Sequence, residues 1–133
     1  MSHALSTSGL RKWIIGAEVA FVDDEQKFIK MLAKRLAFRG IQADAAFSGE
    51  DAIQKIQHLD YDVAVLDIKM PGISGLELKK KLSSLAPELK FIFVTGHGAK
   101  NTLENDLIKK DIFLSKPLNI DTLIKNINEI TKK

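Results

Sequence analysis

Residues 61–72 read Tyr-Asp-Val-Ala-Val-Leu-Asp-Ile-Lys-Met-Pro-Gly. The apolar, β-branched run at residues 63–66 lies between polar residues and the turn formers Pro71 and Gly72, a pattern typical of a strand buried on both faces. Asp67 therefore ends a strand. Ligands bind at that edge of an open parallel α/β sheet, which makes Asp67 a candidate site residue. The alternative is an aspartate that only starts the turn into the next helix.

The remainder of the chain alternates between strand and helix patterns. Apolar runs predict further strands at residues 18–22, 41–47, 91–94 and 112–114. Apolar periodicity and capping signals predict five helices, which cover about residues 25–39, a segment from 48, residues 74–85, residues 101–109 and a segment from about 119. This alternation implies right-handed crossovers and a doubly wound, five-stranded parallel sheet of the α/β class.

Local signals define several helix ends. In the first helix Phe28, Leu32 and Leu36 recur at four-residue spacing, and Gly40 follows this segment and predicts its stop. Ser48 is placed as the N-cap of the second helix, and Ser74 with Glu77 matches a capping box at the start of the third. The segment at 101–109 is short and mostly polar, so we expect it to be the least stable element.

The composition fits a single domain. A chain of 133 residues with 45% hydrophobic residues can build one core. The absence of cysteine excludes disulfides and thiolate metal sites and agrees with a reducing compartment. No apolar run approaches the roughly 18 residues of a membrane span, and the N-terminus lacks the apolar core of a signal peptide. We therefore expect a cytoplasmic protein without a membrane partner.

The net charge of +3 is small, and the lysines occur in short groups without interleaved aromatic residues. We interpret these groups as solvated helix faces and expect no direct binding of nucleic acid. Residues 1–16 are interpreted as a leader, disordered or appended, to a domain that spans residues 17–133. The leader contains Trp13-Ile14-Ile15, which either packs against the domain or contacts a partner, and the pattern does not choose between these.

Polar groups follow the predicted strands at one edge of the sheet. Asp23 and Asp24 follow the first strand, Asp67 ends the third, Thr95 follows the fourth and Lys116 follows the fifth. Because parallel strands end at the same edge, we expect these side chains to converge. Crowded carboxylates repel one another, which raises a pKa or demands a cation, and an oxygen-only ligand set favours Mg²⁺. Lys116 and Thr95 could then contact a phosphoryl group.

Each of these residues also has a plainer interpretation. Asp23 or Asp24 can cap the following helix, and Thr95 can simply finish a strand. Lys116 can be an ordinary surface lysine, although Pro117 fixes it directly after a buried strand. The predicted convergence favours a common site over these separate explanations.

The set resembles the receiver domain of two-component response regulators, over about residues 18–130. The resemblance rests on Asp23-Asp24, on Asp67 within Asp-Ile-Lys-Met-Pro-Gly, on Thr95, and on Lys116-Pro117. It implies a flavodoxin-like fold with strand order 2-1-3-4-5. It also implies that Asp67 is the phosphoacceptor of a signalling switch, with Thr95 and Lys116 on the phosphoryl oxygens.

The resemblance further implies a Mg²⁺ ion. Its ligands would be Asp24 and Asp67 directly, Asp23 through water, and the backbone carbonyl of Lys69. The phosphoryl donor would be a sensor histidine kinase, a phosphotransfer protein or a small molecule such as acetyl phosphate. Members of this family are regulatory domains and not enzymes, apart from slow self-dephosphorylation, which the residues at the positions of Lys69 and His97 tune. The alternative is that these two side chains are only exposed to solvent.

The output implied by the resemblance is a change of surface. Phe113 lies three positions before Lys116, where the family has an aromatic residue that turns inward after phosphorylation. The alternative is that Phe113 is only a core residue. The surface formed by the fourth helix, the fifth strand and the fifth helix would bind a downstream protein or output domain, and phosphorylation-dependent dimerisation is left open.

The sequence departs from the family pattern in one place, and three other classes share parts of the pattern. Thr95 and Lys116 are 21 positions apart (116 − 95), slightly fewer than in relatives, which puts the length of the fourth helix in question. A haloacid dehalogenase-like phosphatase needs a second aspartate two residues after the nucleophile, and Lys69 stands there. A flavin-binding module lacks a phosphate loop after the first strand. An inert receiver-like scaffold would not need the complete set of residues.

Overall fold

The computed structural model of the chain describes residues 17–96 and 111–131. Within them, five parallel strands form one sheet with the order β2-β1-β3-β4-β5. The elements are β1 (Glu18–Val22), α2 (Gln26–Phe38), β2 (Gln42–Ala46), α3 (Gly49–His58), β3 (Val63–Asp67), α4 (Gly75–Leu85), β4 (Lys90–Thr95), β5 (Ile112–Ser115) and α6 (Ile120–Thr131). The predicted strand order and the doubly wound α/β class are confirmed.

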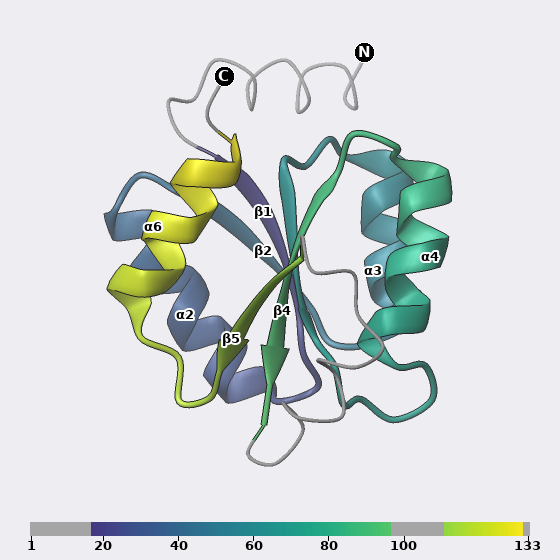
Figure 1. Cartoon of the computed structure of the whole chain (residues 1–133), viewed down its shortest axis with the longest axis horizontal. Coiled ribbons are helices and arrows are strands. Elements are labelled where there is room, and N and C mark those ends of the chain that lie inside the picture. Colours follow the sequence, from purple (N-terminus) through teal and green to yellow (C-terminus); the bar gives the residue numbers. More distant parts are fainter. Residues whose placement is uncertain (1–16, 97–110, 132–133) are drawn as a thin grey trace.

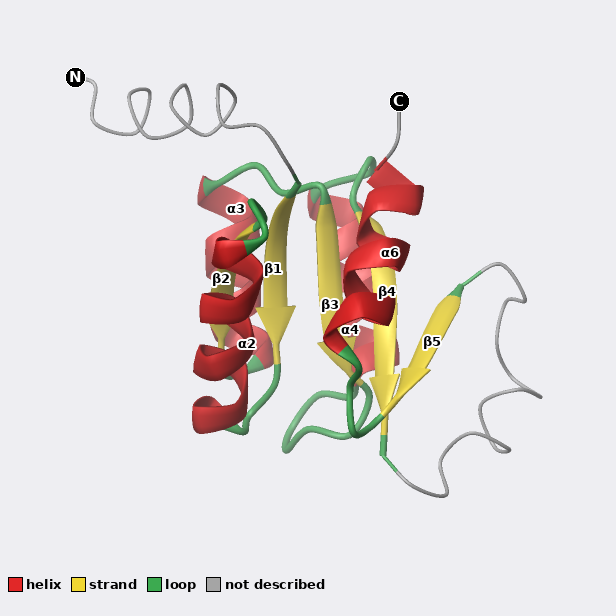
Figure 2. Cartoon of the chain, turned by 90° about the vertical axis from the view of Figure 1, so that its left-hand side faces the viewer, coloured by secondary structure: helices red, strands yellow, loops and turns green. Residues whose placement is uncertain are grey.

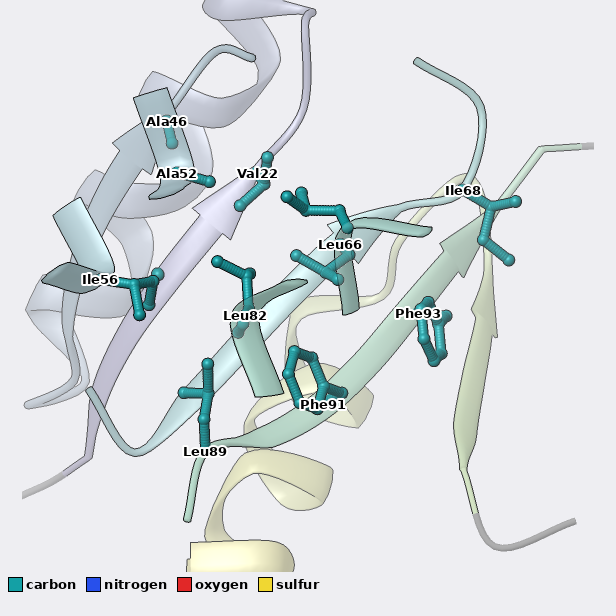
Figure 3. Packing of buried hydrophobic residues seen from close by; sticks show 13 residues of the cluster. Val22, Ala46, Ala52, Ile56, Leu66, Ile68, Leu82, Leu89, Phe91 and Phe93 are labelled. Atoms are coloured by element: carbon teal, nitrogen blue, oxygen red, sulfur yellow. The ribbon is translucent and has the colours of Figure 1, made fainter. Parts of the chain in front are cut away.

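Helices cover both faces of the sheet (Figures 1 and 2). On one face, side chains of α3 and α4 pack with residues of β1, β3 and β4, and Figure 3 shows Leu82 of α4 beside Leu66 and Phe91 of the strands. On the other face, α2 and α6 contribute Leu36 and Leu123 to a second apolar cluster. The central strands β1 and β3 are buried at every position, which explains their uninterrupted apolar runs.

The predicted caps are present. Gly40 has a φ of +80° after α2, and the N–H groups of Gly40 and Ile41 donate to the carbonyls of Ala37 and Leu36, which is a Schellman motif. The Ser48 hydroxyl accepts from the backbone N–H of Asp51 at the start of α3. These signals lie within a few residues of the ends that they mark, which is why the sequence predicted them correctly.

The start of α4 contains only part of the predicted capping box. The Ser74 hydroxyl accepts from the backbone N–H of Glu77 at 3.2 Å, and it also lies 3.4 Å from the Glu77 carboxylate. The structure therefore contains the serine half of the predicted capping box, with the glutamate oriented toward the serine hydroxyl.

Two further expectations concern the helices. Residues 17–96 and 111–131 contain four helices, and the fifth, expected at residues 101–109, lies outside these ranges and stays a prediction. In α2, Ile29 and not Phe28 is the fully buried residue beside Leu32 and Leu36. Phe28 is only partly buried and contacts the sheet edge described below.

Gly75 brings the start of α4 against the end of β3. Its N–H donates to the carbonyl of Ile68, and a Cβ at this position would lie 2.6 Å from the backbone oxygen of Asp67. Only glycine tolerates that approach. The chain from Asp67 to Ser74 is thereby held as a tight loop beside the C-terminal edge of the sheet.

Within residues 17–96 and 111–131, no helix is long and apolar enough to span a bilayer.

Candidate functional site

The C-terminal edge of the sheet carries a group of polar side chains. Asp67 is the last residue of β3 and only 5% of it is exposed. Its Oδ1 accepts from the backbone N–H of Lys69 at 3.3 Å, so the loop that follows the strand orients the carboxylate. The second oxygen, Oδ2, lies 3.5 Å from the Nζ of Lys116.

The two acids after β1 occupy different environments. Asp23 is fully buried, and its Oδ1 accepts from the backbone N–H of Glu25 at 2.9 Å. Asp24 is exposed. Asp23, Asp24 and Asp67 each offer one carboxylate oxygen, and these three oxygens lie within 4.8 Å of one another. The predicted convergence of the three acids is therefore present.

Lys116 arrives from the end of β5 and stands among these carboxylates. Its backbone N–H donates to the carbonyl of Thr95, which extends the β4–β5 pairing to this residue. Its Nζ lies 2.8 Å from Glu25 Oε1 and 3.1 Å from Asp23 Oδ2. The ammonium also lies 5.3 Å from the centre of the Phe28 ring, within range of a cation–π contact.

Glu25 and Phe28 were not predicted as parts of this site. Both belong to the segment that begins α2, 91 and 88 residues before Lys116 (116 − 25 and 116 − 28). No local pattern indicates such a contact. The signal that could have found it is geometric, because the first helical turn after β1 lies at the same edge as the end of β5.

Burial and the neighbouring charges shift the pKa values of Asp67 and Lys116. Burial and then the charge of Asp23 raise the pKa of Asp67 to about 6, although Lys116 and the backbone N–H of Lys69 oppose this. Burial would lower the pKa of Lys116, but its contacts with Glu25, Asp23 and Asp67 outweigh burial and raise that pKa above its ordinary value. At neutral pH, Lys116 is therefore a cation and Asp67 is mostly a carboxylate.

The residues present fit a divalent cation. Asp23 Oδ2 is buried, and among the described residues it has an ion pair with the Lys116 ammonium at 3.1 Å but accepts no well-formed hydrogen bond. A buried carboxylate oxygen that accepts no hydrogen bond destabilises the folded state. A hard cation with oxygen ligands, such as Mg²⁺, would satisfy it together with the other two carboxylates.

Thr95 and Phe113 lie on the neighbouring strands β4 and β5. Thr95 ends β4, is buried, and pairs in register with Ser115 of β5. Phe113 is partly buried and stacks on Phe93, with ring centres 5.1 Å apart and planes 13° apart. Phe113 therefore occupies the apolar cluster on the α3 and α4 face. His97 lies outside the described residues.

This fold and this edge define a class of signalling domain. Residues 19–128 match the family described as the response regulator receiver domain, and the chain belongs to that family. Members are regulatory phosphoacceptor domains of two-component systems, and they bind Mg²⁺ in an acidic pocket. The expectation that the sequence raised about the family is confirmed.

Solved structures and relatives agree with this membership. The Francisella response regulator 1452 receiver domain is 28% identical, with a TM-score of 0.77 over 87% of this chain and 97% of that one. The response regulator TrrA from Thermotoga maritima, in complex with Mg²⁺–BeF, is 30% identical, with a TM-score of 0.73 over 86% and 98%. The transcriptional regulatory protein TcrA from Mycobacterium tuberculosis is 29% identical over 90% of this chain and 48% of its own length.

The curated relatives are longer proteins. This chain spans 32% of the first relative and 48% of TcrA, so half or more of each relative lies outside the similarity. The similarity therefore concerns the receiver domain alone.

Proposed function

We propose that this domain, residues 17–133, is a phosphorylation switch whose phosphoacceptor is Asp67. The observation that carries the proposal is the position of this carboxylate. It is buried at the end of β3, one of its oxygens lies 3.5 Å from an ammonium group, and two further acids stand beside it. A carboxylate in such a setting is oriented for attack and has a partner for the charge that a phosphoryl group brings.

The reaction would be a transfer of a phosphoryl group to oxygen. A carboxylate oxygen of Asp67 forms a bond to phosphorus, and the bond from phosphorus to the donor breaks. The donor is the phosphohistidine of a sensor histidine kinase or phosphotransfer protein, whose imidazole leaves, or acetyl phosphate, which leaves as acetate. The product is an acyl phosphate on Asp67.

Asp23, Asp24, Asp67 and the backbone carbonyl of Lys69 would hold a Mg²⁺ ion. When bound, the ion neutralises charge that builds up on the transferred oxygens. The support from this chain is the carboxylate cluster and the buried oxygen of Asp23 that accepts no hydrogen bond within the described ranges. The relative TrrA, which was solved with Mg²⁺–BeF, adds support by similarity.

Lys116 and Thr95 would receive the new group. At rest the ammonium of Lys116 is shared among Glu25, Asp23 and Asp67, and Glu25 is exposed and able to release it. A phosphoryl oxygen competes well for this ammonium because it carries more charge than a carboxylate. The Thr95 hydroxyl would donate to a second oxygen.

The output would be a change of partner-binding surface. A phosphoryl group adds about 1.5 to 2 negative charges at this edge, which favours the state in which Thr95 moves toward it. Phe113 would act as the switch aromatic by packing alone, since it has no hydroxyl. The surface that binds a downstream protein or output domain would include β5, α6 and the segment at residues 97–110, and it could also serve a phosphorylation-dependent dimer.

Intact-mass spectrometry tests the proposal. The whole chain is incubated with acetyl phosphate and Mg²⁺, and we expect the addition of one phosphoryl group. Asp67→Asn should abolish the addition, and EDTA should reduce it strongly. Asp121→Asn, a change of an exposed carboxylate, is the matched control and should label like the wild type. Equal labelling of Asp67→Asn would refute the assignment, and an unlabelled wild type would favour an inert scaffold.

A further inference from the structure

A cavity of about 720 Å³ lies at the N-terminal edge of the sheet, opposite Asp67. Its walls come from the ends of α3, α4 and α6 and from the segments that lead into β3 and β4. Figure 2 shows these helix ends at the edge away from the strand arrowheads. The proposed phosphorylation chemistry uses none of these residues.

Part of the cavity wall is apolar and exposed. Leu85, at the end of α4, has 44% of its surface exposed, and it is one of three large apolar side chains that are exposed in the described ranges. Ile56 of α3, Leu89 before β4 and Ile130 of α6 line the same cavity. An apolar surface of this kind favours an occupant that contributes apolar side chains.

The rest of the wall is acidic. Asp60, Asp62 and Glu88 line the cavity, against the single cation Lys90 among its lining residues. Three helices also end here, and each C-terminus carries a partial negative charge of about half a unit. The occupant that fits this wall therefore combines apolar groups with positive charge.

The chain enters β1 directly at this cavity. The backbone N–H of Glu18 donates to Asp62 Oδ2 at 2.8 Å, and the backbone N–H of Asp62 donates to the carbonyl of Glu18 at 2.8 Å. Asp62 is itself a lining residue. Any segment that immediately precedes β1 is therefore tethered beside the cavity.

The segment before β1 has the required chemistry. Residues 10–15 read Leu-Arg-Lys-Trp-Ile-Ile, which is four apolar residues and two cations. Three residue steps separate Ile15 from Glu18, and an extended chain covers at most about 10 Å in three steps. Because the tether is this short, the segment can reach the cavity at Asp62 but not the far edge of the sheet.

We propose that residues 10–15 dock into this cavity within the same chain. Trp13, Ile14 and Ile15 cover the apolar wall at Leu85, and the two cations of the segment face the acidic wall. A tether of this length gives an effective concentration on the order of millimolar, so that an intrinsic Kd of about 0.1 mM leaves about nine chains in ten docked. The leader is then part of the folded domain and not a free tail.

Trp13 is the only tryptophan of the chain, so its fluorescence reports on the segment alone. Acrylamide quenching is measured on the whole chain at several protein concentrations, with N-acetyltryptophanamide as the exposed reference. We expect a Stern–Volmer constant severalfold below the reference and independent of protein concentration. Leu85→Glu should raise it to near the reference. Met31→Glu is the matched control, because Met31 is 45% exposed but belongs to α2, and it should change nothing.

A second variant avoids any effect on the fold. Arg11→Glu combined with Lys12→Glu reverses the charge of the segment without touching the described domain, and it should also raise quenching to near the reference. Three results would overturn the proposal. The first is a wild type whose Trp13 is quenched as strongly as the reference. The second is protection of Trp13 from acrylamide that survives both Leu85→Glu and the double charge reversal. The third is protection that appears only as the protein concentration rises, which would indicate docking to a second copy.

Discussion

Replacing Asp67 with asparagine should stabilise the domain in the absence of metal. The carboxylate is buried next to Asp23, and these two causes, in that order, raise its pKa to about 6 despite the attraction of Lys116. In the unfolded chain the pKa of an aspartate is about 3.9. The folded state therefore disfavours the charged form that prevails at neutral pH, and an uncharged amide of the same shape removes that cost.

The size of this stabilisation, and the pH range over which it develops, follow from the two pKa values. A difference of about two pKa units corresponds to about 3 kcal/mol of unfolding free energy at pH 7. The folded pKa is raised, so the cost is absent below about pH 3.8, grows as the pH rises through about 6 and stays constant above that. Asp67→Asn should therefore gain about 3 kcal/mol at pH 7 and about half as much at pH 5.

Urea unfolding in EDTA, followed by far-UV circular dichroism, measures this gain at both pH values. Adding Mg²⁺ should stabilise the wild type and should stabilise Asp67→Asn much less, because a ligand stabilises only the state that binds it. The control is Asp121→Asn, which changes an exposed carboxylate and should gain nothing. A variant less stable than the wild type at pH 7, or a gain that does not fall toward pH 5, would refute the electrostatic description of the site.

Two further predictions concern the elements that support the site. Gly75→Ala should cost about 1–3 kcal/mol in the same urea assay, because its Cβ would lie 2.6 Å from the backbone oxygen of Asp67 and 3.0 Å from the Cα of Ile68; an unchanged midpoint would show that the loop gives way easily. Lys79→Met should cost about 1–3 kcal/mol, because the Lys79 ammonium contacts both oxygens of the mostly buried Asp111 at 2.9 Å. If the double variant Lys79→Met, Asp111→Asn loses as much unfolding free energy as the two single variants together, the two side chains are not energetically coupled.

Much of the fold could be predicted because its signals are local. Consecutive apolar residues predicted β3, and the strand ends at Asp67 as expected. Gly40 and Ser48 marked helix ends because their hydrogen bonds reach only a few residues along the chain. The convergence at one edge follows from the rules for parallel α/β sheets, whereas the order of the strands was predicted from the resemblance to receiver domains.

The contacts that the sequence did not predict join residues far apart in the chain. Glu25 and Lys116 are 91 residues apart, and Lys79 and Asp111 are 32 apart. From the sequence alone, a charged residue is interpreted as a solvated surface residue. Only the three-dimensional arrangement shows which opposite charge lies within contact distance. The same limit applies to Phe28, whose periodicity indicated a core position but whose ring lies beside the Lys116 ammonium.

The first residue of β1 and the last residue of α6 determine where a further domain can be attached to this one. Both lie at the edge that carries the cavity, since Asp62 binds Glu18 and lines the cavity together with Thr131. A further domain fused before residue 17 or after residue 131 is attached on that side, and the edge that carries Asp67 stays clear. The fused domain can therefore be exchanged without a change to the residues around Asp67.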